Sequence, residues 1–421
     1  MNIIKLDNKK HRDGCMALAN DSSLMRDDFC KEKSFRFGSL MLISLLWLLL
    51  SSCQDFLSVD NYFSDELKLD SVFAETRYVK AYMWGAASMF PDEGQILQNN
   101  YTPGPLATDE AFTGFLTVYA YNGMRFVLGE ITAANLYSFN TWGNLYKIIR
   151  KCNTILARID EAKDMTTKER FEIIGYTRFL RAYAYYNILV DFGSPILLGD
   201  KIMESNASLA DYDCIRSTYD EAVEYICSEL EGAAENLPSS VSLMEFGLPT
   251  KGAAYGLIAR IRLIHASPLY NGGDAARAYF GNWKRSTDGA QYVSQNYDEK
   301  RWALAAAAAK RVMDMQASGS VMYKLHTVDA DSDTPALPGD VTSDPDYYKE
   351  WPTGAAGIDP YRSYSEMFTG ESVIPSNPEY VWGRKSAAVT TNTQMSFPQK
   401  LDGFNGMCVT QKVVDAYSMI D

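Results

Sequence analysis

Cys53 is the residue whose surroundings point most clearly to a covalent reaction. An apolar run from Leu40 to Leu50 precedes it, and three basic residues lie upstream of that run, Lys31, Lys33 and Arg36. The run is too short to cross a bilayer, which takes roughly 20 apolar residues. A cationic region, a short apolar region and then small residues are typical of a secretory signal.

The four residues from Leu50 to Cys53 resemble the lipobox of bacterial lipoproteins, where a peptidase cuts before a cysteine whose sulfur carries diacylglycerol. The thiol is the nucleophile for that chemistry, and the small residues Ser51 and Ser52 fit the peptidase. We expect residues 1–52 to be a signal peptide, residues 53–70 a lipid-anchored tether, and residues 71–421 the folded domain. Met25 would give a more usual start for such a signal, so we expect translation to begin there.

The rest of the chain lacks the motifs of common enzymes. Only His265 and His326 follow Cys53, and neither H-E-x-x-H, nor G-x-S-x-G, nor a glycine-rich phosphate loop occurs. A glycosidase needs only two carboxylates at a suitable separation, which leaves that alternative open in an acidic chain. We expect a binding protein and not an enzyme.

An acidic segment, "DADSDTPALPGD", has the spacing of a calcium loop in part. Its acids stand at positions 1, 3, 5 and 12 of the loop count: Asp329, Asp331, Asp333 and Asp340. Thr334 occupies the position where the turn of such a loop needs glycine. A solvated acidic loop is therefore the main interpretation, calcium is a weak alternative, and we expect no cofactor.

The charge and the cysteines exclude several classes of protein. With 40 Lys and Arg against 53 Asp and Glu, the formal net charge is −13, which disfavours binding to nucleic acid. Four cysteines follow Cys53 and match no metal or redox motif: Cys152, Cys214, Cys227 and Cys408. We expect free thiols, with Cys152 and Cys227 buried in helices.

The elements that must position any site are helices. Apolar residues recur at helical spacing in four segments: Trp142 to Ile159, Lys168 to Asp191, Tyr219 to Leu237, and Lys251 to a break at Pro268. The order of helix, short turn, helix, then a gap, predicts helix pairs that stack on one another. A fifth helix is expected over Arg301–Gln316, because this segment is rich in alanine.

Two features inside these helices call for a structural interpretation. Arg178 and Arg181 lie on a helix that is apolar nearly all round, so their guanidinium groups need partners, and we expect a structural salt bridge. Four helical aromatics at core spacing are expected to pack in the core: Trp142, Tyr146, Tyr183 and Tyr186. Between the helices, residues 90–141, 272–297 and 327–377 are rich in Gly, Pro and aromatic residues, which predicts ordered surface loops.

Several segments, in order, carry a resemblance that covers nearly all of the chain after Cys53. They are "CQDFL", "WGNLYKIIRKCNTIL", "GYTRFLRAYAYYNILVDFGSPILL", "TYDEAVEYICSELEGAAENLP", "TKGAAYGLIARIRLIHASPLYN", "NPEYVWGR" and "TQKVVDAYSMID". This ordered set resembles the RagB/SusD family of outer-membrane lipoproteins, which capture nutrients, usually glycans, for a TonB-dependent transporter.

The resemblance implies a mainly α fold, a right-handed superhelix of tetratricopeptide-like helix pairs with a loop-rich region that binds ligand. It also implies a SusC-like transporter as partner, on which the helical face docks, and a lipid-anchored place on the outer membrane facing the cell exterior. Family members continue past the segment that ends at Asp421, so we expect this chain to be truncated at its C-terminus.

Sugar recognition needs flat aromatic faces for the C–H face of a pyranose and polar groups for its hydroxyls. The segment "FLTVYAYNGMRF" offers both, in a region where similar proteins place part of their ligand site. Our candidates are Tyr119, Tyr121, Asn122 and Arg125, with Asp109 as a supporting carboxylate.

Three further loop aromatics complete the candidate set: Trp283, Trp351 and Tyr361. The alternative for each is that it packs a loop against the helices. The leading hypothesis is a surface lipoprotein that captures an oligosaccharide or polysaccharide for import. The alternatives are capture of peptides or another nutrient, a surface glycosidase, and a scaffold of the transporter that has no ligand of its own.

Overall fold

The computed structural model of the chain describes residues 69–92, 104–113, 122–203, 207–351, 353–369, 377–383 and 389–417. Cys53 and the segment before it lie outside the described residues. All described residues fall in one compact unit, Lys68–Asp421. None of the helices found in these ranges is both long enough and apolar enough to span a membrane.

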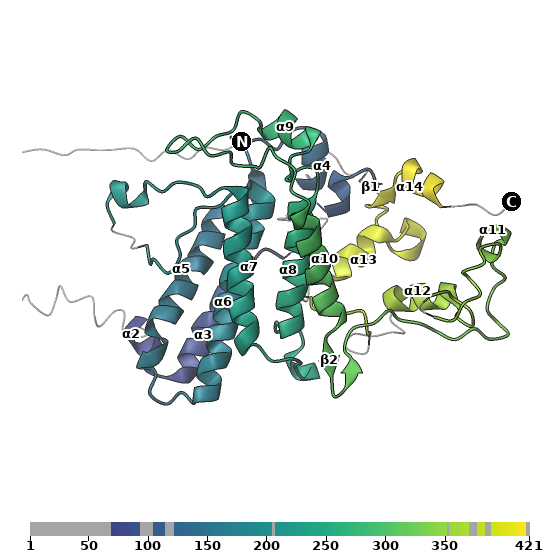
Figure 1. Cartoon of the computed structure of the whole chain (residues 1–421), viewed down its shortest axis with the longest axis horizontal. Helices are drawn as coiled ribbons and strands as arrows, with labels where there is room; N and C mark the ends of the chain where they lie inside the picture. The colour runs from purple at the N-terminus through teal and green to yellow at the C-terminus, as the bar shows by residue number, and fades with distance from the viewer. Residues whose placement is uncertain are drawn as a thin grey trace, which may run out of the picture. The chain divides into compact units, whose positions relative to one another are not determined.

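Six helices form the body of this unit (Figure 1). They are α3 (Thr76–Ala87), α5 (Trp142–Arg158), α6 (Thr167–Phe192), α7 (Tyr219–Asn236), α8 (Lys251–Ala266) and α10 (Lys300–Met313). Each packs against the next in this order. The predicted mainly α fold is confirmed, and the helix pairs are α5 with α6 and α7 with α8.

Shorter elements lie around this body. The helices are α2 (Leu69–Val72), α4 (Asn122–Val127), α9 (Asp274–Phe280), α11 (Gly339–Thr342), α12 (Pro360–Thr369), α13 (Val389–Ser396) and α14 (Gln411–Ala416). The strands form two antiparallel pairs, β1 (Ala111–Phe112) with β4 (Cys408–Val409) and β2 (Gln316–Ala317) with β3 (Ser320–Val321).

The structure corrects two expectations about these elements. The segments predicted as loops contain α4, α9, α11 and α12. The fifth expected helix, α10, ends at Met313, because Gln316 already belongs to a strand.

Side-chain caps explain where the long helices begin. Thr166 caps α6 and Thr218 caps α7, each in a reciprocal box with the glutamate three residues later. Thr250 caps α8 by accepting from the Ala253 amide at 3.3 Å. At the other end of α6, Gly193 adopts φ 75°, which glycine reaches without steric cost.

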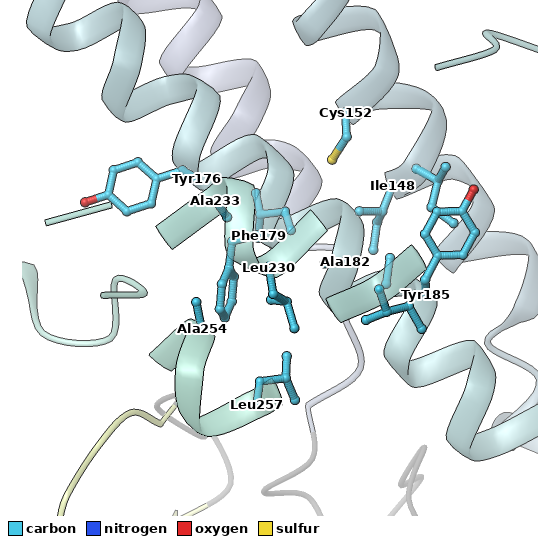
Figure 2. Close-up of a cluster of buried hydrophobic side chains, with 14 of the residues drawn as sticks. Ile148, Cys152, Tyr176, Phe179, Ala182, Tyr185, Leu230, Ala233, Ala254 and Leu257 are labelled. Atoms are coloured by element: carbon cyan, nitrogen blue, oxygen red, sulfur yellow. The ribbon is translucent and has the colours of Figure 1, made fainter. Parts of the chain in front are cut away.

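The core lies between the stacked helices. Figure 2 shows side chains of α5, α6, α7 and α8 meeting there, among them Ile148, Cys152, Tyr176, Phe179, Ala182, Tyr185, Leu230, Ala233, Ala254 and Leu257. Helix α6 is buried along most of its length. The four helical aromatics expected in the core, Trp142, Tyr146, Tyr183 and Tyr186, are partly buried and pack against it, as predicted.

The salt bridge expected for the arginines of α6 is confirmed, and it joins α6 to α7. Arg181 has a side chain only 4% exposed and donates from Nε and from a terminal nitrogen to Glu229 on α7, at 2.9 and 2.6 Å. Its other terminal nitrogen donates to Asn153 on α5 and to Asp200 in the segment after α6, at 2.7 and 2.6 Å. Arg178 also reaches Glu229, at 3.0 Å. One guanidinium therefore joins two helices and the segment that follows α6.

The cysteines differ in accessibility, which gives a first prediction. Within the described ranges, four cysteines are free thiols; Cys152 and Cys227 are buried as expected, and Cys214 and Cys408 are partly exposed. Burial raises the pKa of Cys152 and of Cys227 to about 12, so few thiolates form there at pH 8. We expect iodoacetamide to modify the two buried cysteines at least about a hundredfold more slowly than the exposed pair. Peptide mass spectrometry measures the four rates, and similar rates in the folded protein would contradict the packing described here.

Candidate functional site

The candidate residues before α5 fall partly outside the structure. Cys53, Tyr119 and Tyr121 lie outside the described residues, as does the side chain of Asn122 at the start of α4. Arg125 pairs with Glu130 at 2.9 Å, and its guanidinium lies 3.8 Å from the centroid of the Tyr137 ring. These contacts hold the Arg125 side chain against the segment that follows α4.

Asp109 joins two segments that are far apart in the sequence. Its carboxylate forms an ion pair with Lys412, and its carbonyl oxygen accepts a hydrogen bond from the Thr410 hydroxyl. The hydrogen bond from Lys412 holds the pKa of Asp109 below its usual value. These contacts continue the pairing of β1 with β4, so Asp109 fastens the C-terminal segment beside residues 104–113.

Trp283 packs within a row of aromatic rings. Its ring lies 4.5 Å from that of Tyr292 and 6.2 Å from that of Phe280, measured between centroids. The row continues from Phe280 to Tyr270, and from Tyr270 to Tyr219 at the start of α7. Trp283 therefore holds residues 280–292 against the ends of the helices.

Trp351 lines a pocket of about 500 Å³ in the segment between α11 and α12. Trp351 is 44% exposed, so part of its side chain is open to solvent at this pocket. The lining consists of Val341, Asp344, Asp346, Tyr347, Trp351, Thr353, Gly354 and Ala355. Two aromatic rings, two carboxylates and a hydroxyl thus surround one open space, which can stack a flat ring and hydrogen-bond its substituents.

Backbone hydrogen bonds give this pocket its shape. The Ala355 amide donates to the Tyr347 carbonyl at 2.9 Å, and the Ala356 amide donates to the Lys349 carbonyl at 3.2 Å. The Asp344 carboxylate accepts from the Asp346 amide at 2.9 Å, which closes the preceding turn. The segment therefore folds back on itself and carries Trp351 at its tip.

Gly354 allows this close return of the chain. A Cβ atom there would lie 2.2 Å from the Asp346 carbonyl oxygen and 2.4 Å from that of Lys349. We expect Gly354→Ala to open the segment and to speed its cleavage in limited proteolysis by about tenfold. Gly339→Ala is the matched control, because nothing lies within 4 Å of its added carbon. Equal cleavage of the two variants would show that the close approach does not shape the pocket.

Asp359 attaches the next helix to the neighbouring acidic segment. One of its carboxylate oxygens accepts from the Arg362 amide at 2.9 Å and so caps α12, while the other accepts from the Thr334 hydroxyl at 2.8 Å. The hydrogen bond from the Arg362 amide is the largest of the effects that hold the pKa of Asp359 below its usual value. Tyr361, 42% exposed on the first turn of α12, reaches the Ala336 carbonyl at 3.5 Å.

The calcium alternative receives no support from the described residues. Asp331 pairs with Arg362 at 2.9 Å and also accepts from the Asp333 amide at 2.9 Å. In the ranges that the structure describes, no group of three or more acidic, histidine or cysteine side chains could hold a metal ion. The side chain of Asp340 lies outside these ranges.

Trp351 and Tyr361 both lie in one part of the chain, residues 323–369, but of the two only Trp351 lines the pocket. Trp283, Arg125 and Asp109 make the other contacts described above. Sequence reasoning missed Tyr347 in the pocket wall. It also missed the exposed rings of the same part, which are Tyr348, Tyr364 and Phe368. The available signal was the density of aromatic residues between positions 347 and 368.

Comparisons with known proteins give matches to SusD-like proteins. Residues 55–263 match the SusD-like family model described as "Starch-binding associating with outer membrane". A curated relative, SusD-like protein P25 of Formosa agariphila, is 22% identical over 181 residues, which are 40% of this chain and 33% of that protein.

Solved structures of other proteins also resemble part of the chain. The structure named BT4246 is 22% identical with a TM-score of 0.51, over 61% of this chain and 42% of that one. A SusD-like protein from Bacteroides fragilis is 28% identical with a TM-score of 0.40, over 48% and 37% of the two chains.

The matches thus span about a third of the curated relative and about two fifths of the solved chains. The likeness to BT4246 supports the helical fold alone. Residues 55–263, about half of the chain, are therefore assigned to the SusD-like family.

Proposed function

We propose that this protein is a glycan-binding protein that holds an oligosaccharide or polysaccharide in the pocket beside Trp351. The observation that carries the proposal is the partly exposed Trp351 in the pocket wall, with Tyr347, Asp344, Asp346 and Thr353 around the same space. A pyranose presents a C–H face that packs on an aromatic ring, and hydroxyls at its edge that bond to carboxylates. Membership of the SusD-like family supports the choice of ligand.

The chemistry proposed is binding without bond cleavage. Sugar recognition by stacking and hydrogen bonding needs no general acid or nucleophile, and the sequence carries none of the common catalytic motifs. A surface glycosidase is the contrasting possibility, and it predicts new reducing ends when the protein is incubated with a bound polysaccharide.

The proposal also names a cellular location and a partner protein. Lipidation of Cys53 would anchor the protein to the outer membrane, facing the cell exterior, because each buried methylene of an acyl chain contributes about 0.8 kcal/mol. A SusC-like TonB-dependent transporter would receive the glycan, and the association would raise the local concentration of ligand at the pore. Cys53→Ala should then move the protein from the membrane fraction to the soluble fraction.

Affinity electrophoresis tests the binding proposal. The chain is purified with Cys53 replaced by alanine, so that no lipid is attached, and run in native gels that contain single plant, host or microbial polysaccharides. We expect at least one glycan to slow the protein relative to a reference protein that binds no polysaccharide. If circular dichroism shows a folded helical protein and no glycan slows it, the proposal fails and peptide capture becomes the better hypothesis.

A further inference from the structure

A second pocket, of about 490 Å³, lies on the helical body and not in the segment that carries Trp351. It is formed by the first turns of α5 and by the chain that follows α6. The lining consists of Trp142, Gly143, Tyr146, Lys147, Arg150, Ile196, Leu198, Met203, Tyr212 and Cys214. Its volume falls within the range of about 300–1,000 Å³ that is usual for small-molecule sites.

The walls of this pocket are largely apolar. The rings of Trp142 and Tyr146 lie 4.9 Å apart between centroids, and Ile196, Leu198 and Met203 contribute aliphatic surface. The Tyr146 hydroxyl accepts from the Ile196 amide at 2.7 Å and donates to the Ile196 carbonyl at 3.1 Å. Burial raises the pKa of Tyr146 to about 12, so this hydroxyl stays neutral and is already paired. The body of a ligand would therefore contact ring and methyl groups.

The charge at this pocket is positive, in a protein whose formal net charge is −13. Lys147 and Arg150 line it, and none of the lining residues is acidic. Arg150 donates from Nε to the Met203 carbonyl at 2.6 Å, which fixes its guanidinium at the wall. Lys147 is exposed, and no described residue forms a hydrogen bond or an ion pair with its ammonium group.

A third cation lies next to this wall. The guanidinium of Arg216 is 5.0 Å from the centroid of the Trp142 ring. The electrostatic preference of the pocket is therefore for an anion, while its walls prefer an apolar body.

We propose that this pocket binds a small aryl carboxylate, with its ring against Trp142, Met203 and Leu198 and its carboxylate toward Lys147 and Arg150. A ring system of this kind matches the aromatic and aliphatic walls, and a single negative charge matches the exposed ammonium group of Lys147. A cationic ligand would be repelled by the Lys147 ammonium group, and a bare sugar would find apolar walls in place of hydrogen-bonding groups. The site is thus separate in chemistry from the pocket beside Trp351.

Isothermal titration calorimetry of the full chain with naphthalene-2-carboxylate tests this inference. The neutral isostere naphthalene-2-carboxamide has the same ring and almost the same volume but no charge. We expect the carboxylate to bind about tenfold more tightly than the amide, and added salt to reduce this difference. Absence of binding at millimolar carboxylate, or equal affinity for both compounds, would overturn the inference.

Three variants, one of them a control, locate the site. Lys147→Gln is expected to weaken carboxylate binding about fivefold, because it removes an exposed cation without changing the apolar walls. Lys300→Gln, at the exposed start of α10, is the matched control and should leave the affinity unchanged. Met203→Gln should weaken the binding of both compounds, because it places a polar amide in the apolar wall of the pocket. Equal affinities of the two lysine variants would overturn the placement, and so would loss of polysaccharide binding in Lys147→Gln, since the two pockets would then not be separate.

Discussion

Replacement of Arg181 by methionine is expected to lower the free energy of unfolding by about 3 kcal/mol. The change leaves the Glu229 carboxylate, whose side chain is 9% exposed, with Arg178 alone as its cationic partner. It also removes the hydrogen bonds to Asn153 and Asp200 that attach α5 and the segment after α6. Urea unfolding followed by circular dichroism at 222 nm measures the loss.

An exposed arginine on the same helix provides the control. Arg170 pairs with Asp160 at 2.6 Å, but both side chains face solvent, so Arg170→Met should change stability by no more than about 0.5 kcal/mol. If the two variants lose the same stability, the buried network does not hold α6 to α7 in the way described above.

Replacement of Trp351 by alanine is expected to reduce the affinity for any glycan that the protein binds by about thirtyfold. The change removes the exposed ring from the pocket wall, and central aromatic anchors in binding sites contribute about 2 kcal/mol or more. Trp351→Phe keeps a smaller aromatic face and should recover part of the affinity. Calorimetric titration with oligosaccharides of the polysaccharide that slows the protein in gels measures both values.

Trp302 is the matched control for this change. It lies on α10 and is 40% exposed, close to the 44% of Trp351, but it does not line the pocket. Trp302→Ala should leave the affinity within about twofold of the original value. Comparable losses in the two variants would indicate a general effect of removing a surface tryptophan, and the proposed site would be wrong.

The helix pairs could be predicted because each of their signals is local. Apolar spacing marks the buried side of α5, α7 and α8, and Thr166, Thr218 and Thr250 stand where the caps are needed. The pairing of Arg181 also followed from its place on an apolar helix. The short helix α12 was missed, although Asp359 and Pro360 form a recognisable start, because the surrounding residues have the composition of a loop.

The candidate site was only partly predictable, because its geometry depends on backbone contacts and on contacts between residues that are far apart in the sequence. Trp351 was chosen as a loop aromatic, and its exposure in the structure agrees with that choice. The close return of the chain at Gly354 could not be predicted, because it leaves no periodic pattern in the sequence. Asp109 was chosen for its carboxylate, but its partner Lys412 lies 303 residues later. The pocket at Trp142 was missed because the second wall comes from the chain after α6.

A crystal structure with a bound oligosaccharide, taken from the polysaccharide that slows the protein, tests the central claim most directly. The account predicts a sugar ring stacked on the indole of Trp351, with hydroxyls bonded to Asp344 or Asp346. An oligosaccharide bound elsewhere, with the Trp351 pocket empty, would contradict it.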